Sequence, residues 1–128
     1  MLTISPDDEA AIRQTALDYA EGWYTADPER LGRSLHAGLA KRTLRCDPQT
    51  GAELFIHLTR DGMVKVTAEG GGGNAAAACR VTLLDIWGEV ACARVDSPEY
   101  VDYLHLAKSA GRWQIINVLW ADRANGQH

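Results

Sequence analysis

Residues 101–120, "VDYLHLAKSAGRWQIINVLW", decide the fold class, because they hold two apolar runs separated by one short turn. Runs rich in β-branched, aromatic and leucine residues on either side of a glycine-containing turn are typical of an antiparallel hairpin. If residues 110–111 form a two-residue turn, counting outward from it places Leu104 opposite Asn117. The sequence therefore predicts a β-hairpin with a defined register.

This register also predicts which side chains share a face. One face is apolar apart from one carboxylate and one amide, and it comprises Asp102, Leu104, Leu106, Ile115, Asn117 and Leu119. The other face comprises Tyr103, His105, Ile116, Val118 and Trp120. Because this second face is also too apolar to suit contact with water, we expect it to form a dimer interface.

Earlier segments of the chain show the same strand pattern, divided by turn residues such as Gly88 and the Ser97-Pro98 pair. The predicted strands are residues 39–46, 52–59, 80–87, 89–96, 99–108 and 112–121. The last four follow one another at short intervals, so the sequence predicts an antiparallel meander.

Capping residues predict two helices in the first part of the chain. Ser5 before Pro6, and Asp27 before Pro28, each place a capping oxygen ahead of a proline at the first helical position. We expect the second of these helices to end near His36.

A third helix is predicted at residues 60–69, with Thr59 as its N-cap, although Gly62 and the β-branched residues there also suit a strand. The tract "GGGGNAAAA" at residues 70–78 lacks the lysine and hydroxyl of a phosphate-binding loop, so we interpret it as a flexible connection. Helices followed by a meander predict an α+β fold with helices packed on one face of a sheet.

Composition is that of a globular protein, since 128 residues with 46% hydrophobic content suit one domain over residues 1–128. A net charge of −4 argues against nucleic-acid binding. No apolar run approaches the ~20 residues of a membrane helix, and the N-terminus becomes acidic where a signal peptide would become apolar, so we expect no membrane association and a cytoplasmic location. Cys46, Cys79 and Cys92 suggest no disulfide framework.

Residues 16–42, "ALDYAEGWYTADPERLGRSLHAGLAKR", together with residues 101–120, resemble the putative lumazine-binding family of the nuclear-transport-factor-2-like superfamily (also described as SnoaL-like or cystatin-like). The resemblance implies a cone, in which a strongly curved antiparallel sheet wraps around the N-terminal helices. It also implies a pocket between helices and sheet and a homodimer packed through the outer sheet face. The superfamily includes dehydratases, isomerases, cyclases and binding modules, so the fold does not decide the chemistry.

Asp102 and Asn117 are the polar residues of the predicted inner face, next to Leu104. A carboxylate on a half-buried apolar strand has reason for a raised pKa, which a general acid or base needs near neutral pH. The alternative for Asp102 is a structural hydrogen bond to a neighbouring helix. Asn117 is a candidate contact for a ligand's ring edge, or a satisfied core amide.

His36 and His57 are candidates for proton transfer or ligand contact. His36 follows the second helix, where the resemblance places the mouth of the cone, and its alternative role is to cap that helix. The spacing of these histidines and of His105 and His128 is not typical of a metal site, so we expect neither a metal nor a cofactor.

Tyr19 and Trp23 recur at helical spacing with Ile12 and Ala16. A stripe of rings on a helix is typical of core packing, but in a cone the same face also lines the pocket. Tyr19 needs a hydrogen-bond partner if it is buried, and Trp23 offers a surface on which a flat ligand can stack.

Three functions fit these features. The first is a homodimeric protein that holds a flat or apolar small molecule against Tyr19 and Trp23. Its polar contacts would be His36, Asp102 and Asn117. The second is a cofactor-independent dehydratase, isomerase or cyclase that uses Asp102 or His36 for proton transfer. The third is a module that binds another protein through its apolar sheet face.

Overall fold

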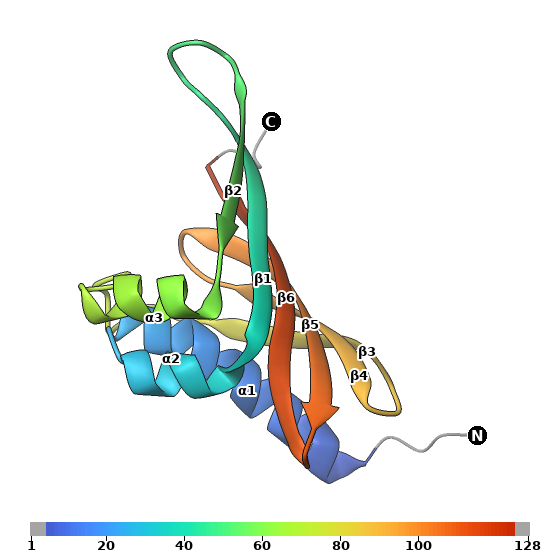
Figure 1. Cartoon of the computed structure of the whole chain (residues 1–128). Helices are drawn as coiled ribbons and strands as arrows, with labels where there is room; N and C mark the ends of the chain where they lie inside the picture. The colour runs from blue at the N-terminus through green and yellow to red at the C-terminus, as the bar shows by residue number, and fades with distance from the viewer. Residues whose placement is uncertain (1–4, 125–128) are drawn as a thin grey trace.

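Three helices lie against one face of a six-stranded sheet in the computed structural model, which describes residues 5–124 (Figure 1). The helices are α1 (Pro6–Tyr24), α2 (Pro28–Ser34) and α3 (Arg60–Ala68). The strands are β1 (Leu35–Cys46), β2 (Glu53–Leu58), β3 (Arg80–Trp87), β4 (Val90–Asp96), β5 (Tyr100–Ser109) and β6 (Arg112–Asp122). This arrangement confirms the predicted α+β class.

Each helix begins at the N-cap that the sequence predicts. The side chains of Ser5, Asp27 and Thr59 accept hydrogen bonds from backbone N–H groups three residues later, at 3.4, 3.1 and 3.1 Å. Helix α2 ends at Ser34, two residues before the predicted end, because Leu35 already has extended backbone angles and starts β1. His36 is therefore a strand residue.

The sheet has the order β2-β1-β6-β5-β4-β3, and the four strands from β3 to β6 form the predicted meander. Four neighbouring pairs are antiparallel, but β1 runs parallel to β6. The expectation of a purely antiparallel sheet is wrong at this pair. No short turn joins β1 to β6, so nothing forces them to run in opposite directions, and the long chain between them permits the parallel pairing.

The β5–β6 hairpin follows the predicted register only near its turn. Leu106 pairs with Ile115, but the next pair is His105 with Asn117, so Ile116 is an extra residue in β6. Such a β-bulge shifts all later partners by one position. The bulge cannot be read from the turn residues that set the register.

The shift changes the faces of the second half of β6. Val118 and Trp120 are buried on the inner face, whereas Leu119 is exposed and Asn117 also turns outward. The predicted faces of these four residues are therefore wrong. Asp102 lies on the inner face as predicted, but it pairs with Trp120.

The core lies between the helices and the inner face of the sheet. Its fully buried members include Ile12 of α1, Leu31 of α2, Leu104 of β5 and Ile115 of β6. This packing fixes α1 against the sheet.

Two glycines of the tract after α3, Gly71 and Gly72, pack closely against the end of α1, whereas most of residues 70–78 are exposed. Gly72 N donates to Trp23 O at 2.9 Å and Asn74 N donates to Tyr24 O at 3.0 Å, so the tract caps the end of α1. A Cβ atom on Gly71 would collide with the carbonyl oxygen of Trp23, so only glycine permits this approach. The tract consequently holds the two rings at the end of α1.

Candidate functional site

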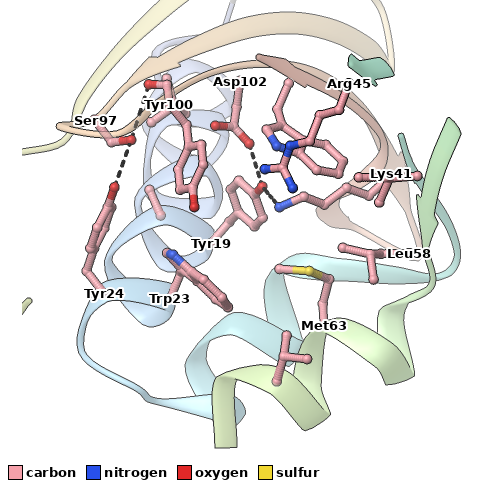
Figure 2. A pocket seen from close by; sticks show the side chains of 15 residues that line it. Tyr19, Trp23, Tyr24, Lys41, Arg45, Leu58, Met63, Ser97, Tyr100 and Asp102 are labelled. Atoms are coloured by element: carbon pink, nitrogen blue, oxygen red, sulfur yellow. Dashed lines mark hydrogen bonds between the residues drawn. The ribbon is translucent and has the colours of Figure 1, made fainter. Parts of the chain in front are cut away.

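A cavity of about 250 Å³ lies between the helices and the inner face of the sheet (Figure 2). Apolar and aromatic side chains form most of its wall, and charged side chains gather on one side. The lining residues are Tyr19, Ala20, Trp23, Tyr24, Lys41, Arg45, Ile56, Leu58, Met63, Val66, Val95, Ser97, Tyr100, Asp102 and Trp120. The cavity is near the lower end of the sizes typical of small-molecule sites, so it suits a small ligand.

The apolar part of the wall comes from α1, α3 and the end of β2. Tyr19 and Trp23 are four residues apart on α1 and so project from the same side of the helix. Met63 of α3 and Leu58 of β2 face them across the cavity (Figure 2). The ring stripe predicted on α1 therefore serves as both core and cavity wall.

Three buried polar side chains form a hydrogen-bonded chain on the charged side of the cavity. Lys41 Nζ donates to the Tyr19 hydroxyl at 2.6 Å, and that hydroxyl donates to Asp102 Oδ2 at 2.6 Å (Figure 2). The exposed fraction is 9% for Lys41, 4% for Tyr19 and 6% for Asp102. Buried charged groups need partners, and one hydroxyl here links a cation to an anion.

Strand alternation brings the two charged groups inside. In β1, Leu39, Lys41 and Thr43 are buried, whereas Arg42 between them is exposed. In β5, Asp102 shares the inner face with Leu104. Lys41 and Asp102 thus both lie on strands whose neighbouring inward-facing residues belong to the core.

Burial controls the protonation of this chain. It raises the pKa of Asp102, and the Lys41 charge and the Tyr19 hydrogen bond only partly oppose that effect. Burial lowers the pKa of Lys41; Asp102 opposes the shift and Arg45 adds to it. Burial and the neighbouring Asp102 raise the pKa of Tyr19 well above its usual value, so Tyr19 remains a neutral hydroxyl.

Trp120 offers its ring to two cations. Lys41 Nζ lies 4.8 Å and the Arg45 guanidinium carbon 5.9 Å from the centroid of the Trp120 ring, within the range of cation–π attraction. Asp122 holds Arg45 through two hydrogen bonds, from Nε at 2.8 Å and from Nη2 at 2.9 Å. Arg45 is thereby fixed at the cavity with one side of its guanidinium group occupied.

The opposite side of the cavity is less polar. The Tyr24 hydroxyl donates to Ser97 Oγ at 3.1 Å, and Tyr100 projects its ring into the cavity (Figure 2). Trp23 Nε1 is the one buried side-chain nitrogen or oxygen in residues 5–124 that has no hydrogen-bond partner. The ring of Trp23 is thus placed by packing alone.

Of the predicted site residues, Tyr19, Trp23 and Asp102 meet at the cavity. Leu104 is buried in the core and is not part of the lining. Asn117 lies on the outer face, where its Oδ1 accepts a hydrogen bond from Arg42 Nη2 at 2.9 Å. The bulge in β6 accounts for the misplaced Asn117.

Neither predicted histidine lines the cavity. His36 lies at the start of β1, where its Nδ1 accepts a hydrogen bond from Gly38 N at 2.9 Å. His57 is exposed on β2. His36 therefore does not share the cavity with Asp102, and the capping role that was its alternative is not found either.

Sequence reasoning missed the two cations and three of the rings, namely Lys41, Arg45, Tyr24, Tyr100 and Trp120. Lys41 and Arg45 belong to a short basic segment that suggests a solvated surface. The available signal was the alternation in β1, since Lys41 falls between Leu39 and Thr43 on the inward side.

Within residues 5–124, no group of three or more histidine, cysteine, aspartate or glutamate side chains is arranged to hold a metal ion, and His128 lies outside this range. The described helices include none that is long and apolar enough to cross a membrane.

Solved structures share this fold over nearly the whole chain. A nuclear-transport-factor-2-like protein from Shewanella baltica has a TM-score of 0.79 and 19% identity, covering 95% of this chain and 98% of that one. A similar protein from Methylobacillus flagellatus has a TM-score of 0.78 and 21% identity, covering 94% and 96%. A ketosteroid isomerase-like protein from Erwinia carotovora has a TM-score of 0.66 and 17% identity, covering 93% and 98%.

These likenesses show a nuclear-transport-factor-2-like cone, and they agree with the resemblance seen in the sequence. No curated protein sequence matches the chain. The profile of one family, described as "Putative lumazine-binding", matches residues 7–121. The chain therefore belongs to the putative lumazine-binding family of the nuclear-transport-factor-2-like superfamily.

Proposed function

We propose that the protein binds one small, flat and mostly apolar molecule in the cavity, with a polar edge directed at Lys41. The observation that carries the proposal is the contrast within one cavity between apolar walls and a single charged side. Binding sites for small molecules commonly combine an apolar lining with a few placed polar groups. The family description, which names a flat heteroaromatic compound, supports the same class of ligand.

The polar groups indicate the complementary atoms of the ligand. An ammonium group has three N–H donors, and Lys41 uses one of them on Tyr19. An oxygen on the edge of a ring would accept from Lys41, while the body of the ring lies against Trp23. We therefore expect carbonyl-bearing ring compounds to bind better than their hydrocarbon counterparts.

Native mass spectrometry of the freshly purified protein, compared with its denatured mass, tests the proposal. We expect extra mass that is lost on denaturation, or acquired when lumazine is added. Trp23→Leu should weaken lumazine binding about tenfold, since it removes a stacking surface. Trp87→Leu is the control, because Trp87 is 69% exposed and lies outside the cavity. Equal affinities of both variants, or no binding by any form, would contradict the proposal.

A second candidate function is catalysis of proton transfer by a dehydratase, isomerase or cyclase. The observation in its favour is that Asp102 and Lys41 share a hydrogen-bonded chain at a cavity, with burial shifting the pKa of each. Tyr19, and not a histidine, is the hydrogen-bond donor next to Asp102. This function requires exchange of a ligand C–H for deuterium in heavy water, with loss of exchange but retention of binding in Asp102→Asn.

We propose further that the protein forms a homodimer through an outer apolar patch formed by Leu44, Phe55 and Leu119. These exposed residues line one shallow groove on β1, β2 and β6, and Phe55 is 65% exposed. Phe55→Glu should convert the dimer to a monomer in light scattering after size exclusion, whereas Leu84→Glu on β3 should not. A monomeric parent protein would favour the third function, a module that binds a different protein.

A cytoplasmic location is also part of the proposal. The free thiols of Cys46, Cys79 and Cys92 support it, because unpaired cysteines suit a reducing compartment. Cell fractionation with an antibody to the protein tests it, and recovery outside the cytoplasm would contradict it.

A further inference from the structure

Lys41 differs from the other lysines of the chain, Lys65 and Lys108. Lys65 is exposed on α3, and Lys108 forms an ion pair with Asp8 at 3.0 Å. Lys41 is buried, and its Nζ lies between two rings, 4.9 Å from the centroid of Tyr19 and 4.8 Å from that of Trp120. Its amine also borders the cavity (Figure 2).

The hydrogen bonds around Lys41 run in one direction. Lys41 donates to Tyr19, and Tyr19 donates to Asp102. If the Lys41 proton moves to the Tyr19 oxygen while the Tyr19 proton moves to Asp102, the result is a neutral amine and a neutral carboxyl group. Tyr19 stays neutral throughout, so the chain can transfer the proton without forming a tyrosinate.

The surroundings shift both groups toward this neutral arrangement. Burial lowers the pKa of Lys41, and the neighbouring Arg45 lowers it further, although the Asp102 charge opposes both. Burial raises the pKa of Asp102. Lysines become nucleophiles in proteins when they are desolvated in an apolar pocket or placed next to another cation, and Lys41 meets both conditions.

We propose that Lys41 is a nucleophile that forms a Schiff base with an aldehyde or ketone group on a flat ligand in the cavity. The proposal rests on the proposed function, because the ligand must first occupy the cavity. The apolar wall suits an aromatic carbonyl compound, with its ring against Trp23 and its carbonyl carbon at Lys41.

The atoms balance without any further reactant. The neutral Lys41 nitrogen forms a bond to the carbonyl carbon, and a proton moves from that nitrogen to the carbonyl oxygen. Tyr19 then donates its proton to the leaving oxygen and regains one from Asp102, so that water departs. The products are a protonated imine on Lys41, one water molecule and the Asp102 carboxylate, which neutralises the imine charge through Tyr19.

Reductive trapping tests the proposal on the unaltered protein. Naphthaldehyde is added with sodium cyanoborohydride, which reduces imines to stable amines, and labelled peptides are quantified over time by mass spectrometry. We expect labelling of Lys41 about tenfold faster than of Lys65, because a carbonyl held next to an amine reacts faster than one that meets it by diffusion. Labelling of Lys41 at or below the rate of Lys65 overturns the proposal.

Matched probes and variants separate this inference from the proposed function. Naphthalenemethanol has the same ring without a carbonyl group, and its binding is measured by tryptophan fluorescence. If this alcohol binds but naphthaldehyde is not trapped on Lys41, the cavity binds ligands and the nucleophile proposal fails. If neither compound binds nor labels Lys41, both proposals fail.

Tyr19→Phe tests the proton path to the imine. We expect it to slow trapping on Lys41 while leaving the rate at Lys65 unchanged, and a raised pH should restore part of the Lys41 rate by deprotonating the amine directly. An unchanged Lys41 rate in a folded Tyr19→Phe protein would contradict the path through Asp102.

Discussion

Replacing Tyr19 by phenylalanine removes one oxygen atom that two buried charged groups share, while the ring and its packing remain. That oxygen accepts a hydrogen bond from Lys41 at 2.6 Å and donates one to Asp102 at 2.6 Å. A hydrogen bond to a charged group contributes about 1.5–3 kcal/mol. Two such bonds disappear and water entering the cavity replaces part of them, so we expect the free energy of unfolding to fall by about 3 kcal/mol.

Tyr24→Phe is the matched control, because Tyr24 belongs to the same helix and is 3% exposed. Its hydroxyl makes a single side-chain hydrogen bond to an uncharged partner, Ser97, at 3.1 Å. We expect this variant to lose about 1 kcal/mol. Urea unfolding at neutral pH, followed by circular dichroism, measures both losses on the same scale.

Equal losses in the two variants would refute the reasoning, because the Tyr19 oxygen would then not bridge buried charges. A change of background sharpens the test. In a protein that already carries Lys41→Met and Asp102→Leu, the Tyr19 hydroxyl has lost both partners, and removing it should cause no loss of stability. A loss of about 3 kcal/mol in that background as well would show that the stabilisation does not come from the hydrogen bonds of Tyr19 to Lys41 and Asp102.

Three more predictions concern stability. A Cβ on Gly72 would lie 2.6 Å from a ring carbon of Tyr24, so Gly72→Ala should lower the free energy of unfolding by about 1–3 kcal/mol and the melting temperature with it. Hydrogen bonds from two arginines lower the pKa of Asp96 to about 2 from the usual 3.8. The stabilisation that ionised Asp96 provides is therefore complete above pH 3.8 and is lost as the pH falls through about 2. In urea unfolding, Asp96→Asn should be less stable than the parent by about 1 kcal/mol at neutral pH, since the arginines are partly exposed, and the difference should disappear as the pH falls below about 2. The double variant Lys41→Met/Asp102→Leu should be at least as stable as the parent in the same assay, yet lose ligand binding in fluorescence titration.

Local signals explain how much of the fold could be predicted. The helix starts were predictable from the N-cap residues, because an N-cap acts on the turn that directly follows it. All three side chains cap as expected, namely those of Ser5, Asp27 and Thr59. The hairpin register fails beyond Ile116 because a bulge depends on how the whole sheet curves. The parallel pairing of β1 with β6 is likewise a property of the assembled sheet.

The candidate site was predictable only in part, for the same reason. Tyr19, Trp23 and Asp102 lie on faces that helical and strand periodicity define, and they meet at the cavity. Lys41 and Arg45 lie in a segment that also carries exposed Arg42, so charge alone suggests a surface. Two things distinguish Lys41 and Arg45 from exposed residues such as Arg42. One is the alternation of β1, and the other is the position of this side of the strand on the inner face of the sheet.

The Lys41–Tyr19–Asp102 chain is costly for a small domain to keep. Moving an ammonium and a carboxylate out of water carries a penalty of several kcal/mol per ion, and an apolar replacement of similar volume is commonly neutral or stabilising. The three groups are nevertheless buried at the edge of a cavity, with Lys41 and Asp102 on strands and Tyr19 on α1. If stability alone mattered, apolar side chains of similar volume would serve in their place. Their position at the cavity, where Lys41 has N–H donors beyond the one it uses on Tyr19, agrees with the ligand contact proposed above.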